Sequence, residues 1–158
     1  MPLASVNSTY TDIVTSVFSS AIAGKVWFAS AAAFLALVQI TTASRIYGKL
    51  RWLPGQIFGV RVGTIHRWSG RLALLCTFPV AFHCIFILGF QSYDTRVLVH
   101  SILGSFFYGV FAVKVLVVRD HSLPGWALPV AGGTLFSVLI SLWATSSYWY
   151  FTTVRFGF

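Results

Sequence analysis

Four segments of this chain are long and apolar enough to cross a lipid bilayer, and they leave few residues for anything else. They lie near residues 22–42, 63–89, 97–118 and 126–150. A helix rises about 1.5 Å per residue, so each segment can span a hydrocarbon layer of roughly 30 Å. Spanning strands would need alternating apolar and polar residues, and runs such as Leu72-Ala73-Leu74-Leu75 show none. The sequence therefore predicts an all-α integral membrane protein, a four-helix bundle.

The composition excludes a soluble domain of this size. Hydrophobic residues make up 57% of the 158 residues and charged residues only 9%, whereas a soluble domain carries roughly a quarter. The first apolar segment starts too late and is too long for a cleaved signal peptide, so we expect it to be retained. The chain then divides into an outer N-terminal tail (1–20), a transmembrane domain (21–152) and a C-terminal tail (153–158).

The basic residues predict how the bundle is oriented. Eight of the eleven Lys and Arg residues lie at the first and third connections between spans: Arg45, Lys49, Arg51, Arg61, Arg67, Arg71, Lys114 and Arg119. By the positive-inside rule these connections face the cytoplasm, which puts both termini outside. Topology thus accounts for the net charge of +8, and no nucleic-acid partner is expected. A basic surface on which a partner protein docks is left open.

Two histidines lie at one depth on neighbouring spans. His83 is near the end of the second span and His100 near the start of the third, and only a short polar turn separates these spans. Ionisable residues inside a span are costly and usually functional. The pattern predicts haem b near the outer face, with His83 and His100 as axial ligands and Gly104 leaving room for the macrocycle. In the alternative interpretation, the histidines only form hydrogen bonds between helices.

Neighbouring side chains extend the candidate site. Arg96 lies beside the outer histidines and can pair with a haem propionate, or it anchors the helix at the interface. His66, next to Arg67 at the cytoplasmic end of the second span, can serve a second haem or an inner quinone site. Its natural partner would be His121, after the third span. The 17-residue step from His66 to His83 leaves them about 100° apart around a helix, so one haem is the safer prediction and two are left open.

Three further features of the spans bear on this site. Pro79, about one turn before His83, is expected to bend the helix and aim His83 at the bundle centre. Lys114, about one turn from the inner boundary, either reaches the cytoplasmic headgroups or contacts a propionate or a quinone. Cys76 and Cys84 lie eight residues apart on one helix, about 12 Å along its axis, so neither a disulfide nor a cysteine metal site is expected.

These motifs carry a resemblance to a known group of proteins. The run His66-Arg67-Trp68-Ser69-Gly70-Arg71, the pair His83 and His100, and the length of four spans resemble an uncharacterised, mainly actinobacterial family of four-helix membrane proteins. That family is similar to the bis-histidine cytochromes b of the ferric-reductase type. The likeness covers roughly residues 60–151 and implies haem b between helices. The reductases place paired histidines thirteen or fourteen residues apart, whereas the spacings here are 17 and 21.

A second resemblance leads to a different interpretation. The sequence beginning at His66 is similar to the HR-x-S/T-G element, and that beginning at His100 to the H-x-x-x-G element, of succinate dehydrogenase cytochrome b anchor subunits. This likeness implies that Arg67 and Ser69 contact quinone and that His100 holds haem. The sequence departs from that pattern at Gly63, where a serine is expected.

Together these observations predict the function. We expect a multi-pass protein of the cell membrane that passes electrons through haem between a quinone or cytoplasmic donor and an outer acceptor, as an oxidoreductase or an electron-transfer subunit. No catalytic residue is assigned. The expected partners are membrane lipid, a quinone and a separate electron donor or acceptor protein, and assembly as a homo-oligomer or within a respiratory complex is left open. The alternatives are a quinone-site anchor subunit and a haem-free assembly subunit.

Overall fold

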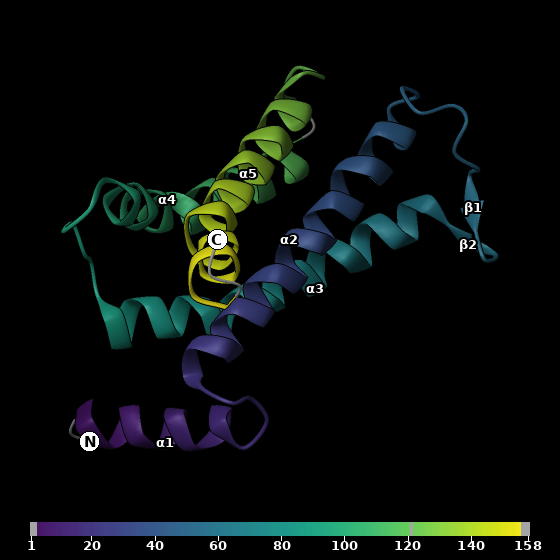
Figure 1. The fold of residues 1–158 in the computed structure, drawn as a ribbon. Coiled ribbons are helices and arrows are strands. Elements are labelled where there is room, and N and C mark those ends of the chain that lie inside the picture. Colours follow the sequence, from purple (N-terminus) through teal and green to yellow (C-terminus); the bar gives the residue numbers. More distant parts are fainter. Residues whose placement is uncertain (1–2, 121, 156–158) are drawn as a thin grey trace.

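The computed structural model describes residues 3–120 and 122–155, and most of them are helical (Figure 1). Four helical segments are long and apolar enough to cross a membrane: Ala21–Ile46, Val62–Leu88, Thr95–Arg119 and Ala127–Val154. These ranges differ from the expected spans by only a few residues at each end. The prediction of an all-α membrane protein with four spans is therefore confirmed.

Side-chain caps define where two of these helices begin. Helix α2 (Ala21–Ile46) starts after Ser20, whose Oγ accepts a hydrogen bond from the Ala23 N–H at 3.1 Å. Helix α4 (Thr95–Arg119) starts after Asp94, whose carboxylate accepts from the Arg96 N–H at 3.1 Å. Both residues satisfy N–H groups that have no partner within the first turn of a helix.

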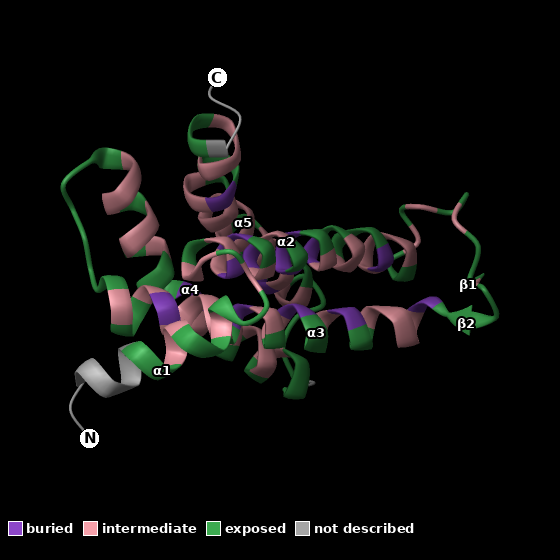
Figure 2. Ribbon diagram, turned by 60° about the horizontal axis from the view of Figure 1, so that its bottom comes forward, coloured by how far each residue is buried: buried purple, intermediate pink, exposed green. Residues whose placement is uncertain are grey.

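Helix α2 is the centre of the packing. It lies along α3 (Val62–Phe82) and also contacts α5 (Ala127–Trp143), which pairs with α4 (Figure 1). Its buried side is made of small residues: Gly24, Val26, Ala29, Ala32, Ala33 and Ala36. Small residues let helices approach closely where lipid, rather than water, surrounds them. Figure 2 shows the buried residues gathered on α2 and α3, while α4 is mostly exposed or half-buried.

Two of the spans change from α- to π-helix towards one end. Helix α3 continues as η1 (His83–Leu88), and α5 continues as η2 (Ala144–Tyr148) and η3 (Tyr150–Arg155). The first change follows Pro79, which lies inside α3, and the His83 N–H is shared between the carbonyls of Pro79 and Val80. Short π-helical turns occur often at functional sites. The transition at His83 therefore coincides with the residue that the sequence singles out.

The N-terminal tail contains a helix. Helix α1 (Leu3–Thr15) lies across the N-terminal end of α2 (Figure 1). The contact is close at Gly24, where an added Cβ would lie 2.6 Å from Val14 Cγ1. The sequence left open whether this tail lies along the interface or is disordered, and its described part is an ordered helix against the bundle.

A short hairpin joins α2 to α3. Strands β1 (Gln56–Ile57) and β2 (Val60–Arg61) pair antiparallel around the two-residue turn Phe58-Gly59. Both turn residues have positive φ, 49° and 76°, as in the type I′ turns that suit two-residue hairpins. Phe58 is fully exposed, so no packing contact offsets the strain of a bulky residue in this conformation.

We expect the Phe58→Asn substitution to stabilise the protein. Asn adopts positive φ more readily than Phe, so the free energy of unfolding should rise by about 1 kcal/mol. Reversible unfolding in detergent micelles measures this change. The matched control is Phe90→Asn, because Phe90 is also an exposed phenylalanine and is not among the described residues with positive φ. Equal effects of the two substitutions would contradict the role of backbone strain.

Candidate functional site

His83 is the most unusual polar side chain of the described region. It is only 3% exposed, and both of its ring nitrogens are buried without a hydrogen-bond partner among the described residues. The only other buried side-chain atom there without such a partner is Ser147 Oγ. A buried polar group without a partner costs about 1–3 kcal/mol and calls for an explanation. An imidazole with two unpaired nitrogens is free to bind a metal centre.

Aromatic side chains from two helices cover His83. The Tyr10 ring of α1 lies 5.8 Å from the His83 ring and 5.0 Å from that of Phe82, measured between centroids. Phe82 in turn packs against Phe86 at 5.0 Å. The N-terminal helix, to which the sequence assigned no role, therefore forms part of the wall around His83. No sequence motif indicated this contact.

His100 is held by a threonine of the neighbouring helix. Its Nδ1 lies 2.9 Å from Thr145 Oγ1, and that hydroxyl is itself 2.8 Å from the Ser141 carbonyl, to which it donates. When the hydroxyl hydrogen goes to Ser141, Thr145 can accept from the His100 Nδ1–H. Nε2 would then carry the free lone pair, which is the tautomer that metal-binding histidines commonly have.

His66 has the same arrangement at the other end of the bundle. Its Nδ1 lies 2.9 Å from Thr42 Oγ1, which donates to the Val38 carbonyl at 2.6 Å. The backbone carbonyl of His66 also accepts a hydrogen bond from the side-chain amide of Gln39. His66 is thus fixed against α2 through its ring and its carbonyl. Sequence reasoning missed both threonines, since only the way the helices pack shows which ones face a histidine.

His83 is the first residue of η1 and His100 lies in the second turn of α4, so both are near the connection between these helices. Lys25, near the start of α2, interacts electrostatically with both His83 and His100. His66 lies 17 residues before His83, about 25 Å away at the helical rise, and it interacts instead with Lys114. The predicted second ligand at the inner end, His121, lies outside the described residues. Residues 3–120 and 122–155 contain no group of three or more His, Cys, Asp or Glu side chains that would hold a metal ion.

Arg96 and Gly104 lie on the side of α4 that faces the end of α5. The Arg96 guanidinium donates to the Thr145 carbonyl at 2.6 Å, lies 4.0 Å from the Trp149 ring centroid and forms an ion pair with Asp94 at 3.6 Å. Arg96 therefore contacts the same threonine as His100. At Gly104, an added Cβ would make an ordinary van der Waals contact with Leu142, at 3.9 Å.

Arg67 and Ser69 lie on different faces of α3. Arg67 is exposed, whereas Ser69 is 5% exposed. Ser69 Oγ accepts from Gln39 Nε2 at 2.7 Å and donates to the Ile65 carbonyl at 2.8 Å. The likeness to succinate dehydrogenase anchors implies that Arg67 and Ser69 both contact quinone. In the structure these two side chains do not face the same site. Ser69 instead joins α3 to α2.

This architecture is that of a multi-pass α-helical membrane protein, in which lipid covers the exposed apolar side chains and histidines lie between the helices. The chain belongs to the family of unknown function DUF6529, whose model matches residues 4–158. The match includes α1 as well as the four spans. No curated protein and no solved structure matches the chain.

Proposed function

We propose that this protein is a cytochrome b of the cell membrane, with haem b bound near the outer face by His83 and His100. The observation that carries the proposal is the buried His83 side chain, whose two ring nitrogens have no partner in the described part of the chain. Bis-histidine ligation fills both axial positions of the iron and so suits one-electron transfer.

The residues around the two histidines fit such a group. Thr145 orients the His100 ring and leaves Nε2 free. Lys25, near the start of α2, carries a positive charge that would attract propionate groups. Tyr10 shields His83 from one side. These residues would bind and orient the cofactor, which itself supplies the redox chemistry.

In this proposal, electrons pass between a quinone or a cytoplasmic donor and an outer acceptor. His66 supports a second redox site near the inner face of the membrane. Thr42 contacts its ring in the way that Thr145 contacts the ring of His100. One outer haem is the core of the proposal, and a second haem at His66 extends it. A separate protein would supply or accept the electrons.

The second candidate is a haem-free assembly or anchoring subunit. It is favoured by the hydrogen bonds that join His66 to Thr42 and His100 to Thr145, since such bonds also serve helix packing alone. This candidate gives no reason for the unpaired nitrogens of His83. It therefore explains two of the three described histidines.

A spectrum of the purified protein distinguishes these candidates. The full chain is produced in cells supplied with haem, and its dithionite-reduced minus oxidised visible spectrum is recorded with haem quantified per chain. We expect sharp b-type bands and at least one haem per chain. A colourless protein would contradict the cytochrome proposal and leave the assembly subunit.

A further inference from the structure

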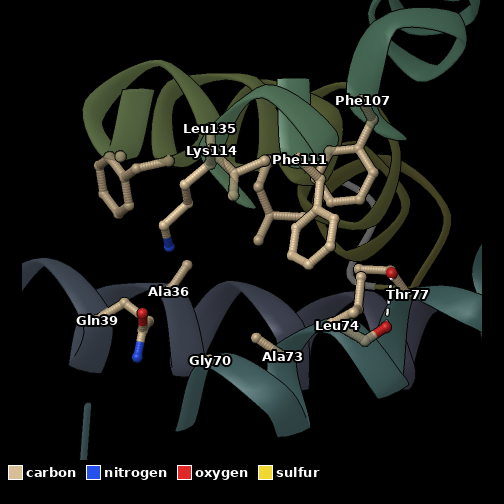
Figure 3. Close-up of a pocket in the computed structure, with 13 residues that line it drawn as sticks. Ala36, Gln39, Gly70, Ala73, Leu74, Thr77, Phe107, Phe111, Lys114 and Leu135 are labelled. Carbon is tan, nitrogen blue, oxygen red and sulfur yellow. Dashed lines mark hydrogen bonds between the residues drawn. The ribbon is translucent and has the colours of Figure 1, made fainter. Parts of the chain in front are cut away.

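A cavity of about 70 Å³ lies among the four long helices (Figure 3). Every span contributes to it, with Gln39 of α2, Gly70 of α3, Lys114 of α4 and Gly132 of α5 among the lining residues. The volume is several times the roughly 10–15 Å³ that one water molecule requires. The cavity therefore has room for a group of several atoms.

The Lys114 ammonium is the only charged group that lines this cavity. In Figure 3 its nitrogen extends towards Ala36 and Gln39 of α2. No hydrogen bond or ion pair joins Lys114 to another residue of the described ranges. The acidic residues of the chain are Asp12, Asp94 and Asp120, and all three lie outside the spans. An ammonium inside a span without a counter-charge is costly, so an electronegative ligand atom would stabilise it.

Most of the remaining lining is apolar, and three of its side chains are aromatic. Phe107 and Phe111 of α4 face the cavity in Figure 3, and Phe136 of α5 also lines it. An added Cβ at Gly132 would meet nothing within 4 Å, so the wall is open there. Aromatic side chains pack well against flat rings. A small hydrated anion would lose its water against these walls, which favours an apolar ligand with one or two oxygen atoms.

We propose that this cavity binds the head group of a lipid-soluble quinone, with the Lys114 ammonium donating a hydrogen bond to a ring carbonyl oxygen. The proposal rests on the proposed function, in which a quinone exchanges electrons with haem. It assigns the quinone to a position between all four helices and away from Arg67. Gln39 connects the position to the inner histidine, since its amide lines the cavity and donates to the His66 carbonyl.

The location agrees with a ligand that enters from the membrane. Lys114 lies five residues before the end of α4 at Arg119, about 8 Å along the helix. The cavity is therefore within the hydrocarbon layer but near the face predicted to be cytoplasmic. A quinone ring reaches this depth from the lipid, whereas a water-soluble reductant does not.

The test is equilibrium binding of decylubiquinone to the purified full chain in detergent, measured by titration calorimetry. We expect saturable binding by the wild type and an affinity at least tenfold lower for Lys114→Met, with part of it retained in Lys114→Arg. The matched control is Lys49→Met in the loop before the hairpin, which should bind as the wild type does. Gly132→Phe is a second variant that fills the cavity and leaves Lys114 in place, and it too should lose binding.

Two results would overturn the quinone site: no saturable binding by the wild type, or equal binding by Lys114→Met. Lys114-dependent binding of oleate in place of the quinone would also overturn it, because the ammonium would then hold a carboxylate. Haem is quantified on the same samples. A coloured protein that binds no quinone refutes this site and leaves the cytochrome, while a colourless protein with Lys114-dependent binding supports this site and refutes the cytochrome.

Discussion

The His83→Ala substitution is expected to abolish the b-type bands of the reduced-minus-oxidised spectrum. Haem iron with one axial histidine missing is held weakly, and His83 is a buried imidazole with neither nitrogen engaged by the described residues. His100→Ala should have the same effect, because its Nε2 would occupy the opposite axial position. Haem per chain, measured on the purified variants, should fall by one equivalent in each.

The neighbouring Cys84 provides the matched control. Cys84 lies next to His83 in η1 and is half-buried, so Cys84→Ala makes a comparable change to the same turn without removing an imidazole. It should retain the full spectrum. Unchanged bands in His83→Ala would exclude His83 as a ligand. Unchanged bands in His100→Ala would require a different second ligand.

The Arg96→Ala substitution should produce a large loss of stability. It removes a charged hydrogen bond to the Thr145 carbonyl and a stacking contact with Trp149, which together contribute about 2 kcal/mol. The exposed ion pair with Asp94 adds little. Arg96→Lys should recover only part of this loss, since an ammonium cannot reproduce the planar contacts. Reversible unfolding in mixed micelles measures the effect.

Arg51→Ala is the appropriate control for this substitution. Arg51 is exposed in the loop between α2 and the hairpin, so its loss should leave the unfolding free energy within about 0.5 kcal/mol of the wild type. The experiment also distinguishes two roles for Arg96. If Arg96 served only to bind a haem propionate, its removal would lower haem affinity and leave the stability of the haem-free protein unchanged.

The four spans could be predicted because the bilayer imposes a length and an apolar composition on any helix that crosses it. The depth of His83 and His100 followed from their places near the ends of adjacent spans. Their partners could not be predicted in this way. Thr42 and Thr145 are two of many hydroxyl residues, and only the crossing of one helix over another selects them.

Two local features were missed for different physical reasons. Helix α1 is amphipathic but rich in Ser and Thr and too short to span the membrane, so its docking at Gly24 depends on tertiary contacts. The hairpin has strands of two residues, too short for an alternating pattern. Its turn carries Phe58 where Asn or Asp would be the usual signal.

The two Thr–His pairs lie at opposite ends of the bundle, and this separation has a consequence for energy conversion. On α3 and η1, His66 and His83 are about 25 Å apart along the axis. An electron that passed from a site at His66 to an outer haem would cross most of the membrane's electric field, worth about 2.3 kcal/mol per 100 mV. With the predicted topology and a negative interior, the membrane potential would drive electrons outward. Turnover in energised vesicles would then depend on voltage as well as on the potentials of donor and acceptor.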